Sequence, residues 1–216
     1  MGAAMTGSIS KAELGRMFAE AARLIRDRSD YLSQLDSQCG DGDHGTTMMR
    51  SMEILENAIG PRNGLSVSEM FREAGWSVMG ADGGASSALL GSFIVGLGEV
   101  QLGDEMDCAA MAASLKAGLN AVEKRTKARP GDKTMMDALI PAVEAFSASA
   151  AKNMGLPEAM SGAAAAAEAG AEATKNIAAR YGRARHLGDK TLGCPDAGAT
   201  SMALLFRGFS IALAGE

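Results

Sequence analysis

Apolar residues recur every three to four positions through most of the chain, which is the spacing of one face of an α-helix. The first such stripe includes Leu14, Phe18 and Ile25, and it predicts a helix from about Ser10 to about Leu32. Glycine- and proline-containing turns separate this stretch from further stretches of the same kind. The pattern therefore predicts eight helices, over residues 10–32, 46–59, 66–81, 85–101, 107–128, 132–153, 156–180 and 199–214.

The connections between these helices are short, and no long linker or change of composition divides the chain. Short links make consecutive helices antiparallel neighbours. We therefore expect an all-α fold, an eight-helix antiparallel up-and-down barrel or bundle without strands. Residues 1–216 are expected to form a single domain and residues 1–9 a flexible tail. The alanine run at 163–167 predicts a closely packed helix, because alanine has high helix propensity and permits close approach.

Composition and charge narrow the class of protein. The 216 residues carry a formal net charge of −5, which leaves no basic footprint for nucleic acid. Three cysteines without zinc-site spacing indicate a reducing compartment, and no uninterrupted apolar run approaches the ~18 residues of a membrane span. We expect a cytoplasmic protein that binds neither nucleic acid nor membranes. Any phosphate-bearing ligand must then be held by local groups.

The most informative stretch runs from Leu35 to Thr47. Its three aspartates, Asp36, Asp41 and Asp43, fall within eight positions and are separated by glycines that let the backbone turn back. Two carboxylates about 4 Å apart repel by roughly 4 kcal/mol at an effective dielectric constant near 20, so a loop that brings them together needs a cation. Oxygen ligands without a Cys–His pattern favour Mg²⁺ or Ca²⁺. The alternative is a solvated acidic turn with Asp43 as a helix N-cap.

Known motifs do not account for this loop. Gly40-x-Gly42-x-x-Gly45 matches the dinucleotide fingerprint in form, but no apolar strand precedes it. The EF-hand pattern fails because Met52 stands where the twelfth-position glutamate is required, and a Walker A sequence is absent. What remains is a set of carboxylates directly before a helix N-terminus, whose N–H groups and positive dipole suit phosphate. The sequence therefore predicts a metal–nucleotide site.

Three further loops open helices with glycine, hydroxyl or acidic residues, at 83–88, 130–135 and 194–200. A turn followed by an N-cap explains each loop taken alone, but together with the acidic loop they can lie at one end of a bundle. In the absence of a metal ion, the neighbouring carboxylates are expected to favour the charged form of His44. Arg183 is a candidate for a phosphate or ribose contact.

Taken in order along the chain, these motifs resemble the L subunit of bacterial dihydroxyacetone kinases, the nucleotide-binding part of those enzymes. The shared blocks are Gly40-Asp-Gly-Asp-His-Gly45, Gly83-Gly-Ala-Ser86, Pro130-Gly-Asp-Lys-Thr-Met135, Gly182-Arg183 and Asp196-Ala-Gly-Ala-Thr200. The resemblance implies an eight-helix barrel with ADP or ATP bound at one end. It also implies that Asp36, Asp41 and Asp43 are catalytic residues holding two Mg²⁺ ions. The implied nucleotide contacts are His44, Gly45, Thr46, Thr47, Gly84, Ala85, Ser86, Met135, Arg183, Asp196, Ala197 and Gly198.

The same resemblance implies a kinase that acts on dihydroxyacetone or a related triose or tetrulose. In that family a separate K subunit holds the ketose, and the phosphoryl donor is ATP or an ADP that a phosphotransferase-system M subunit recharges; a homodimer is a further assembly to consider. Thr47 stands where asparagine is usual and Ala197 where proline is common, which leaves the substrate and the donor open. Two other functions stay open: a nucleotide-sensing module without turnover, and a metal-dependent hydrolase with His44 as base.

Overall fold

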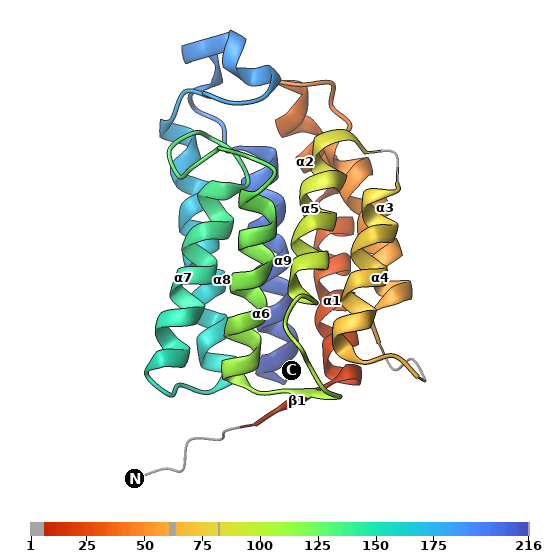
Figure 1. Ribbon diagram of the computed structural model, residues 1–216. Helices are drawn as coiled ribbons and strands as arrows, with labels where there is room; N and C mark the ends of the chain where they lie inside the picture. Colours follow the sequence, from red (N-terminus) through yellow and green to blue (C-terminus); the bar gives the residue numbers. More distant parts are fainter. Residues whose placement is uncertain (1–6, 61–63, 82, 216) are drawn as a thin grey trace.

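The computed structural model describes residues 7–60, 64–81 and 83–215. Within this part of the chain, eight helices stand side by side in a closed ring, each packed against the next, and the last packs against the first (Figure 1). The expected all-α, eight-helix antiparallel barrel is therefore confirmed. Its members are α1 (Lys11–Asp27), α3 (His44–Ala58), α4 (Val67–Met79), α5 (Gly84–Leu97), α6 (Cys108–Glu123), α7 (Met136–Ala151), α8 (Leu156–Ala173) and α9 (Ala197–Ala214).

A short additional helix, α2 (Ser29–Ser37), packs against α3 and α9 at one end of the ring. The prediction of one continuous helix over residues 10–32 is therefore wrong. Helix α1 ends at Asp27, and Arg28 has a φ angle of −113°, outside the helical range. A run of polar residues interrupts the apolar stripe here. The chain changes direction at that point, and α2 then buries the side chains of Leu32 and Leu35.

The loop between α6 and α7, residues 124–135, is longer than the sequence pattern predicted. The pattern predicts that the sixth helix begins at residue 132, but the Asp132 carboxylate accepts the N–H of Arg129 at 2.9 Å within the loop. The helix instead begins at Met136. Its first-turn carboxylate, Asp137, accepts two backbone N–H groups of the loop at 2.6 and 2.7 Å. A side chain inside the helix therefore fixes the loop that precedes it.

The connection from α8 to α9 contains two short 3₁₀ helices. Helix α8 ends at Ala173, before the predicted boundary near residue 180. It is followed by η1 (Thr174–Asn176) and, within the glycine-rich connection, by η2 (Arg183–Thr191). The η2 segment lies over the same end of the ring as α2 (Figure 1).

Two two-residue strands lie at the opposite end of the ring, which corrects the expectation of no strand. β1 (Ile9–Ser10) pairs antiparallel with β2 (Glu105–Met106), with Ile9 opposite Met106. Two residues are too few to show the alternation that identifies a strand in a sequence. The expected tail at 1–9 is also shortened, because Ile9 is only 4% exposed. Residues 1–6 lie outside the described part of the chain.

The centre of the barrel is filled by aromatic and aliphatic side chains. The ring of Phe18 on α1 meets that of Phe209 on α9 edge-on, with centroids 4.8 Å apart. In α8, three alanines of the run at 163–167 are buried, as expected of a closely packed helix. By length and composition α9 alone among the described helices is apolar enough to cross a membrane, but it packs between α1 and α8 as a member of the ring.

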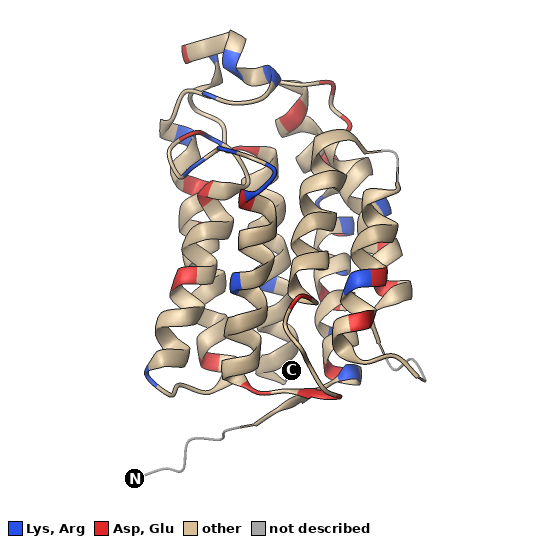
Figure 2. Cartoon of the chain, in the orientation of Figure 1, with Lys and Arg blue, Asp and Glu red and all other residues tan. Residues whose placement is uncertain are grey.

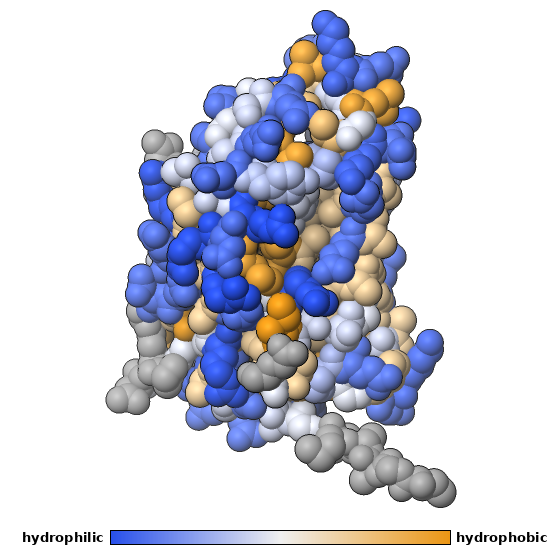
Figure 3. All heavy atoms as spheres, turned by 180° about the vertical axis from the view of Figure 1, so that it is seen from behind, coloured by the Kyte–Doolittle hydropathy of each residue, from blue (hydrophilic) through white to orange (hydrophobic). Residues whose placement is uncertain are grey.

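On the face seen from behind, an apolar strip is bordered by hydrophilic residues (Figure 3). Among the described residues the large apolar side chains that reach solvent are few, and Trp76 on α4 is the most exposed of them at 60%.

We expect Phe18→Ala to lower the free energy of unfolding by about 3–5 kcal/mol, because it leaves a cavity beside Phe209 in a core that cannot fully relax. Trp76→Ala is the matched control. It removes an even larger aromatic group, but from a solvent-exposed position, and is expected to change stability by less than about 1 kcal/mol. Urea denaturation followed by far-ultraviolet circular dichroism measures both. Equal losses in the two variants would contradict the assigned core.

Candidate functional site

Helices α3, α5, α7 and α9 begin at the same end of the barrel. The first residues of α3, α5 and α9 and the residue just before α7 line a single pocket of about 300 Å³, a volume at the lower end of ligand-binding cavities. The four helix-opening loops singled out in the sequence therefore do lie together. Acidic residues of the loop after α2 and basic residues of the η2 segment lie at the same end of the barrel (Figure 2). The pocket thus combines helix N-termini with charges of both signs.

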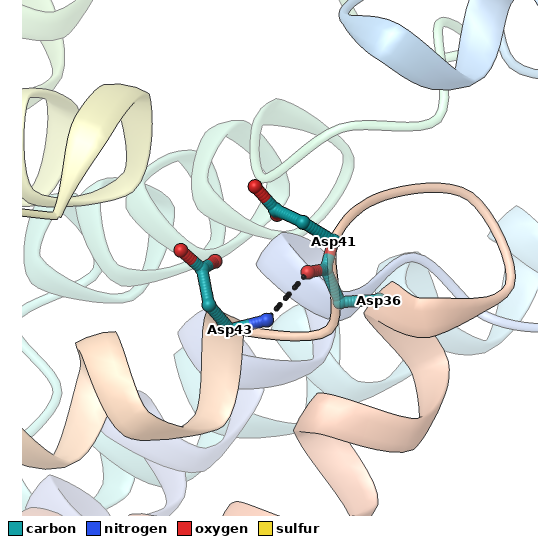
Figure 4. Close-up of side chains that lie close together, drawn as sticks. All are labelled: Asp36, Asp41 and Asp43. Carbon is teal, nitrogen blue, oxygen red and sulfur yellow. Dashed lines mark hydrogen bonds between the residues drawn. The ribbon is translucent and has the colours of Figure 1, made fainter.

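Three aspartates form the acidic part of the pocket. Asp36 comes from the end of α2, whereas Asp41 and Asp43 come from the loop that leads into α3 (Figure 4). Each offers a carboxylate oxygen that lies within 4.8 Å of the others. The Asp36 carboxylate accepts the backbone N–H groups of Gly42, at 2.8 Å, and Asp43, at 3.1 Å. The loop is therefore folded around one of its own carboxylates.

Glycines make this fold possible. Gly42 has a φ angle of +78°, a conformation that residues with a side chain rarely adopt. A Cβ atom at Gly40 would collide with the Asp36 carboxylate. The alternative of a solvated turn before α3 stays open, because Asp41 and Asp43 are exposed, although the Asp43 side chain makes no capping hydrogen bond. The three carboxylates lie close together, and oxygen-only donors at this spacing fit a hard divalent cation such as Mg²⁺.

Arg183 reaches the acidic loop from η2 and forms a close ion pair with Asp41. The hydrogen bond from this guanidinium holds the pKa of Asp41 below its ordinary value. One cationic side chain thus offsets one of three negative charges. Asp36 and Asp43 have no cationic partner among the described ion pairs, so the cluster keeps a net negative charge that an added cation would neutralise.

His44, the first residue of α3, is buried between two hydroxyl groups. Its Nδ1 lies 3.1 Å from Ser86 Oγ on α5, and its Nε2 lies 3.1 Å from Ser201 Oγ on α9. Asp36 and Asp43 favour the charged imidazole, as expected, but burial has the larger effect and lowers the pKa of His44. Because both ring nitrogens are engaged by serines, the geometry does not favour His44 as the base of a hydrolase. The imidazole instead ties three helices together.

The predicted phosphate-binding residues divide into two groups. Gly84, Ala85 and Ser86 line the pocket together with His44. Three others do not line it, and each has a different place in the structure. Gly45 packs against the Ser29 carbonyl of α2, Thr46 is exposed, and Thr47 is buried against Gly83. The first turn of α3 nevertheless leaves backbone N–H groups without intrahelical acceptors, since the first helical bond is donated by Thr47.

The remaining predicted contacts, Met135, Arg183, Asp196, Ala197 and Gly198, also line the pocket. We call the part formed by Met135 and residues 196–198 the apolar wall. Met202 on α9 and, on α5, Leu89 and Leu90 are further apolar lining residues. The side chain of Asp196 caps α9 by accepting the N–H of Ala199 at 2.7 Å. Burial raises the pKa of this carboxyl to about 7.

Some pocket residues were not predicted as site residues. Ser201 and Tyr181 belong to no recognised motif, because each is a common residue type in an ordinary helix or loop, so nothing in the sequence signals a role for them. Lys133 and Cys39 stand inside the quoted blocks or beside the aspartates but had no assigned role. Lys133 is the most unusual of these, because it is a buried lysine with a φ angle of +61°.

The Asp196 carboxyl gives a pH dependence of stability. Its folded pKa of about 7 lies above the ordinary value of 3.8, so it stabilises the fold below about pH 4 and this contribution is lost as the pH rises through 7. Asp196→Asn keeps a capping oxygen but does not titrate. In nucleotide-free protein, we expect the stability of the natural chain relative to this variant to fall by about 2 kcal/mol from pH 5 to pH 8. Urea denaturation at several pH values measures it, and a constant difference would contradict it.

Comparison with known proteins places this site in a family. The model of the DAK2 domain matches residues 38–210. The ADP-binding subunit DhaL of the PEP-dependent dihydroxyacetone kinase of Escherichia coli is 30% identical over 206 residues, which cover 95% of this chain and 98% of that protein. The corresponding subunit of kinase 1 of Listeria innocua is 32% identical, covering 85% of this chain and 87% of its own length.

The fold is shared with a solved structure. The native dihydroxyacetone kinase of C. freundii superimposes with a TM-score of 0.68 and 25% identity, over 92% of this chain and 34% of that one. The same kinase in complex with AMP-PNP and Mg²⁺ gives a TM-score of 0.70 at 24% identity. The matched range contains Asp41, Asp43 and every residue that lines the pocket except Leu35 and Asp36, and on this evidence the chain belongs to the DAK2 domain family.

Proposed function

We propose that this protein is the nucleotide-binding, phosphoryl-transferring subunit of a kinase for dihydroxyacetone or a related triose or tetrulose. The observation that carries the proposal is the meeting of three carboxylates with helix N-termini in one pocket. The first group suits a metal ion and the second suits phosphate. The names of the relatives support the choice of reaction, since they include DhaL subunits and a D-erythrulose kinase of Mycolicibacterium smegmatis that is 33% identical.

In this proposal each part of the pocket has one task. Asp36, Asp41 and Asp43 hold two Mg²⁺ ions, which supply positive charge that offsets the charge developing on the phosphates during transfer. The first turns of α3 and α5 donate backbone N–H groups to phosphate oxygens, with Ser86 fixed by its contact with His44. The apolar wall around Met135 receives the base, and Arg183 and Asp196 lie beside the ribose.

The proposed function also implies partner subunits. The ketose would be bound by a separate K subunit, and the phosphoryl donor would be ATP or an ADP recharged by a phosphotransferase-system M subunit. The DhaL relatives support this arrangement, because their names describe ADP-binding subunits of PEP-dependent kinases. We propose a cytoplasmic location, and a homodimer remains a proposal to be tested by light scattering.

We expect Asp43→Asn to weaken binding of Mg-ADP at least tenfold, because it removes a carboxylate from the cation cluster. Since the side chain makes no capping bond, helix content should not change. Asp30→Asn is the matched control: the same change on an exposed aspartate of α2, outside the pocket. Isothermal titration calorimetry and circular dichroism measure the two effects. Unchanged affinity in Asp43→Asn would overturn the assignment of the site.

The kinase itself is tested by reconstitution. Mixed with a ketose-binding K subunit, dihydroxyacetone and either Mg-ATP or Mg-ADP with a phosphorylated M subunit, the chain should form dihydroxyacetone phosphate, which mass spectrometry detects. Omitting any one component should stop product formation. Steady phosphate release from ATP by the chain alone would favour a hydrolase. Tight nucleotide binding without product under both donor conditions would favour a sensing module.

A further inference from the structure

Lys133, a buried lysine in the loop before α7, lies beside the apolar wall of the pocket. Lys133 is 5% exposed, and its backbone is in the left-handed region with a φ angle of +61°. Both features are unfavourable for a lysine, since an ammonium group loses hydration and a side chain crowds the left-handed backbone. Asn153 is the other described non-glycine residue with positive φ, and it lies after α7 at the far end of the barrel.

The ammonium of Lys133 joins two segments that are remote in sequence. Its Nζ donates to the carbonyl oxygen of Thr174, just after α8, at 2.7 Å, and to that of Cys194, just before α9, at 2.5 Å. Lys133 itself stands just before α7. One ammonium group therefore holds together the ends of three helices, and no other described lysine makes two such bonds to backbone carbonyls.

Further contacts extend this junction into the pocket wall. The hydroxyl of Thr174 accepts the N–H of Asp196 at 2.8 Å, which fixes the start of α9. Gly198 lies beside Met135, since an added Cβ atom would be 3.4 Å from the Met135 nitrogen, in ordinary van der Waals contact. The two halves of the apolar wall thus meet directly, and the carbonyls held by Lys133 flank that meeting point. Movement of either segment would separate them.

We propose that Lys133 is a positioning residue for the nucleotide, which fixes the wall formed by Met135 and residues 196–198 against which the base packs. The inference rests on the proposed function and adds a residue that acts through the backbone carbonyls of Thr174 and Cys194. Two of its three N–H groups are used by these carbonyls, so its main work is within the protein. The hydrogen bonds of this junction do not involve Asp36, Asp41 or Asp43, which form the acidic half of the pocket.

The test separates the two halves of the ligand. Lys133→Met keeps the length of the side chain but removes the donors, so the wall should loosen while the aspartate cluster stays in place. We expect the dissociation constant of Mg-ADP to rise at least tenfold and that of Mg-pyrophosphate, which lacks base and ribose, to change less than twofold. Lys175→Met is the matched control. It removes the same charge from a nearby lysine whose ammonium pairs with Glu172 at the surface.

A second variant guards against misfolding. Thr174→Val removes the hydroxyl that holds Asp196 but keeps the carbonyl that Lys133 binds, and it should show the same selective loss with a smaller rise. Calorimetry with both ligands and circular dichroism are measured for all variants. Equal losses for the two ligands, no loss for either, or unfolding of both variants would overturn the inference. If the natural chain itself does not bind Mg-ADP, the proposed function fails. If the natural chain binds Mg-ADP and the Lys133→Met chain binds it equally well, only the inference about Lys133 fails.

Discussion

In a closed ring of antiparallel helices every second helix begins at the same end, and this constraint decides where ligand chemistry is available. Here α3, α5, α7 and α9 begin together, so their N-termini supply backbone N–H groups and partial positive charge to one pocket. The opposite charge comes from three carboxylates held within 4.8 Å of one another. Groups that attract anions and groups that attract cations therefore lie side by side. A phosphate ligand carrying a metal ion satisfies both at once.

The sequence predicts the barrel well because the apolar repeat of each helix is strong and its ends carry turn residues. It fails where a few residues decide the outcome. The break at Arg28 lies in a polar run that a helix also tolerates on its outer face, and a strand of two residues has no readable period. The structure brings twelve of the fifteen predicted site residues to the pocket, but Gly45, Thr46 and Thr47 do not line it. The contacts of all fifteen residues with a nucleotide or metal ion remain predictions.

Burial explains the other differences between expectation and structure. A sequence shows that His44 stands next to aspartates, but it does not show that two helices cover the imidazole, and burial outweighs the carboxylates. Lys133 is similar, because only the packed structure brings the ends of α8 and α9 to its ammonium group. The motifs that contain these residues are visible in the chain. The gain from new contacts and the cost of lost hydration at each residue depend on the packing of helices that are remote in sequence, which the sequence does not show.

Trp76 is the single tryptophan of the chain, and its 60% exposure has a spectroscopic consequence. An indole already in contact with water in the folded state gives red-shifted emission, so unfolding should change its fluorescence little. Helix α4 leads, through Gly83, to the end of the barrel where the pocket lies. The same indole is thus a natural reporter of surface coverage. A blue shift on mixing with another protein would show that the partner covers this side of the barrel, without any attached dye.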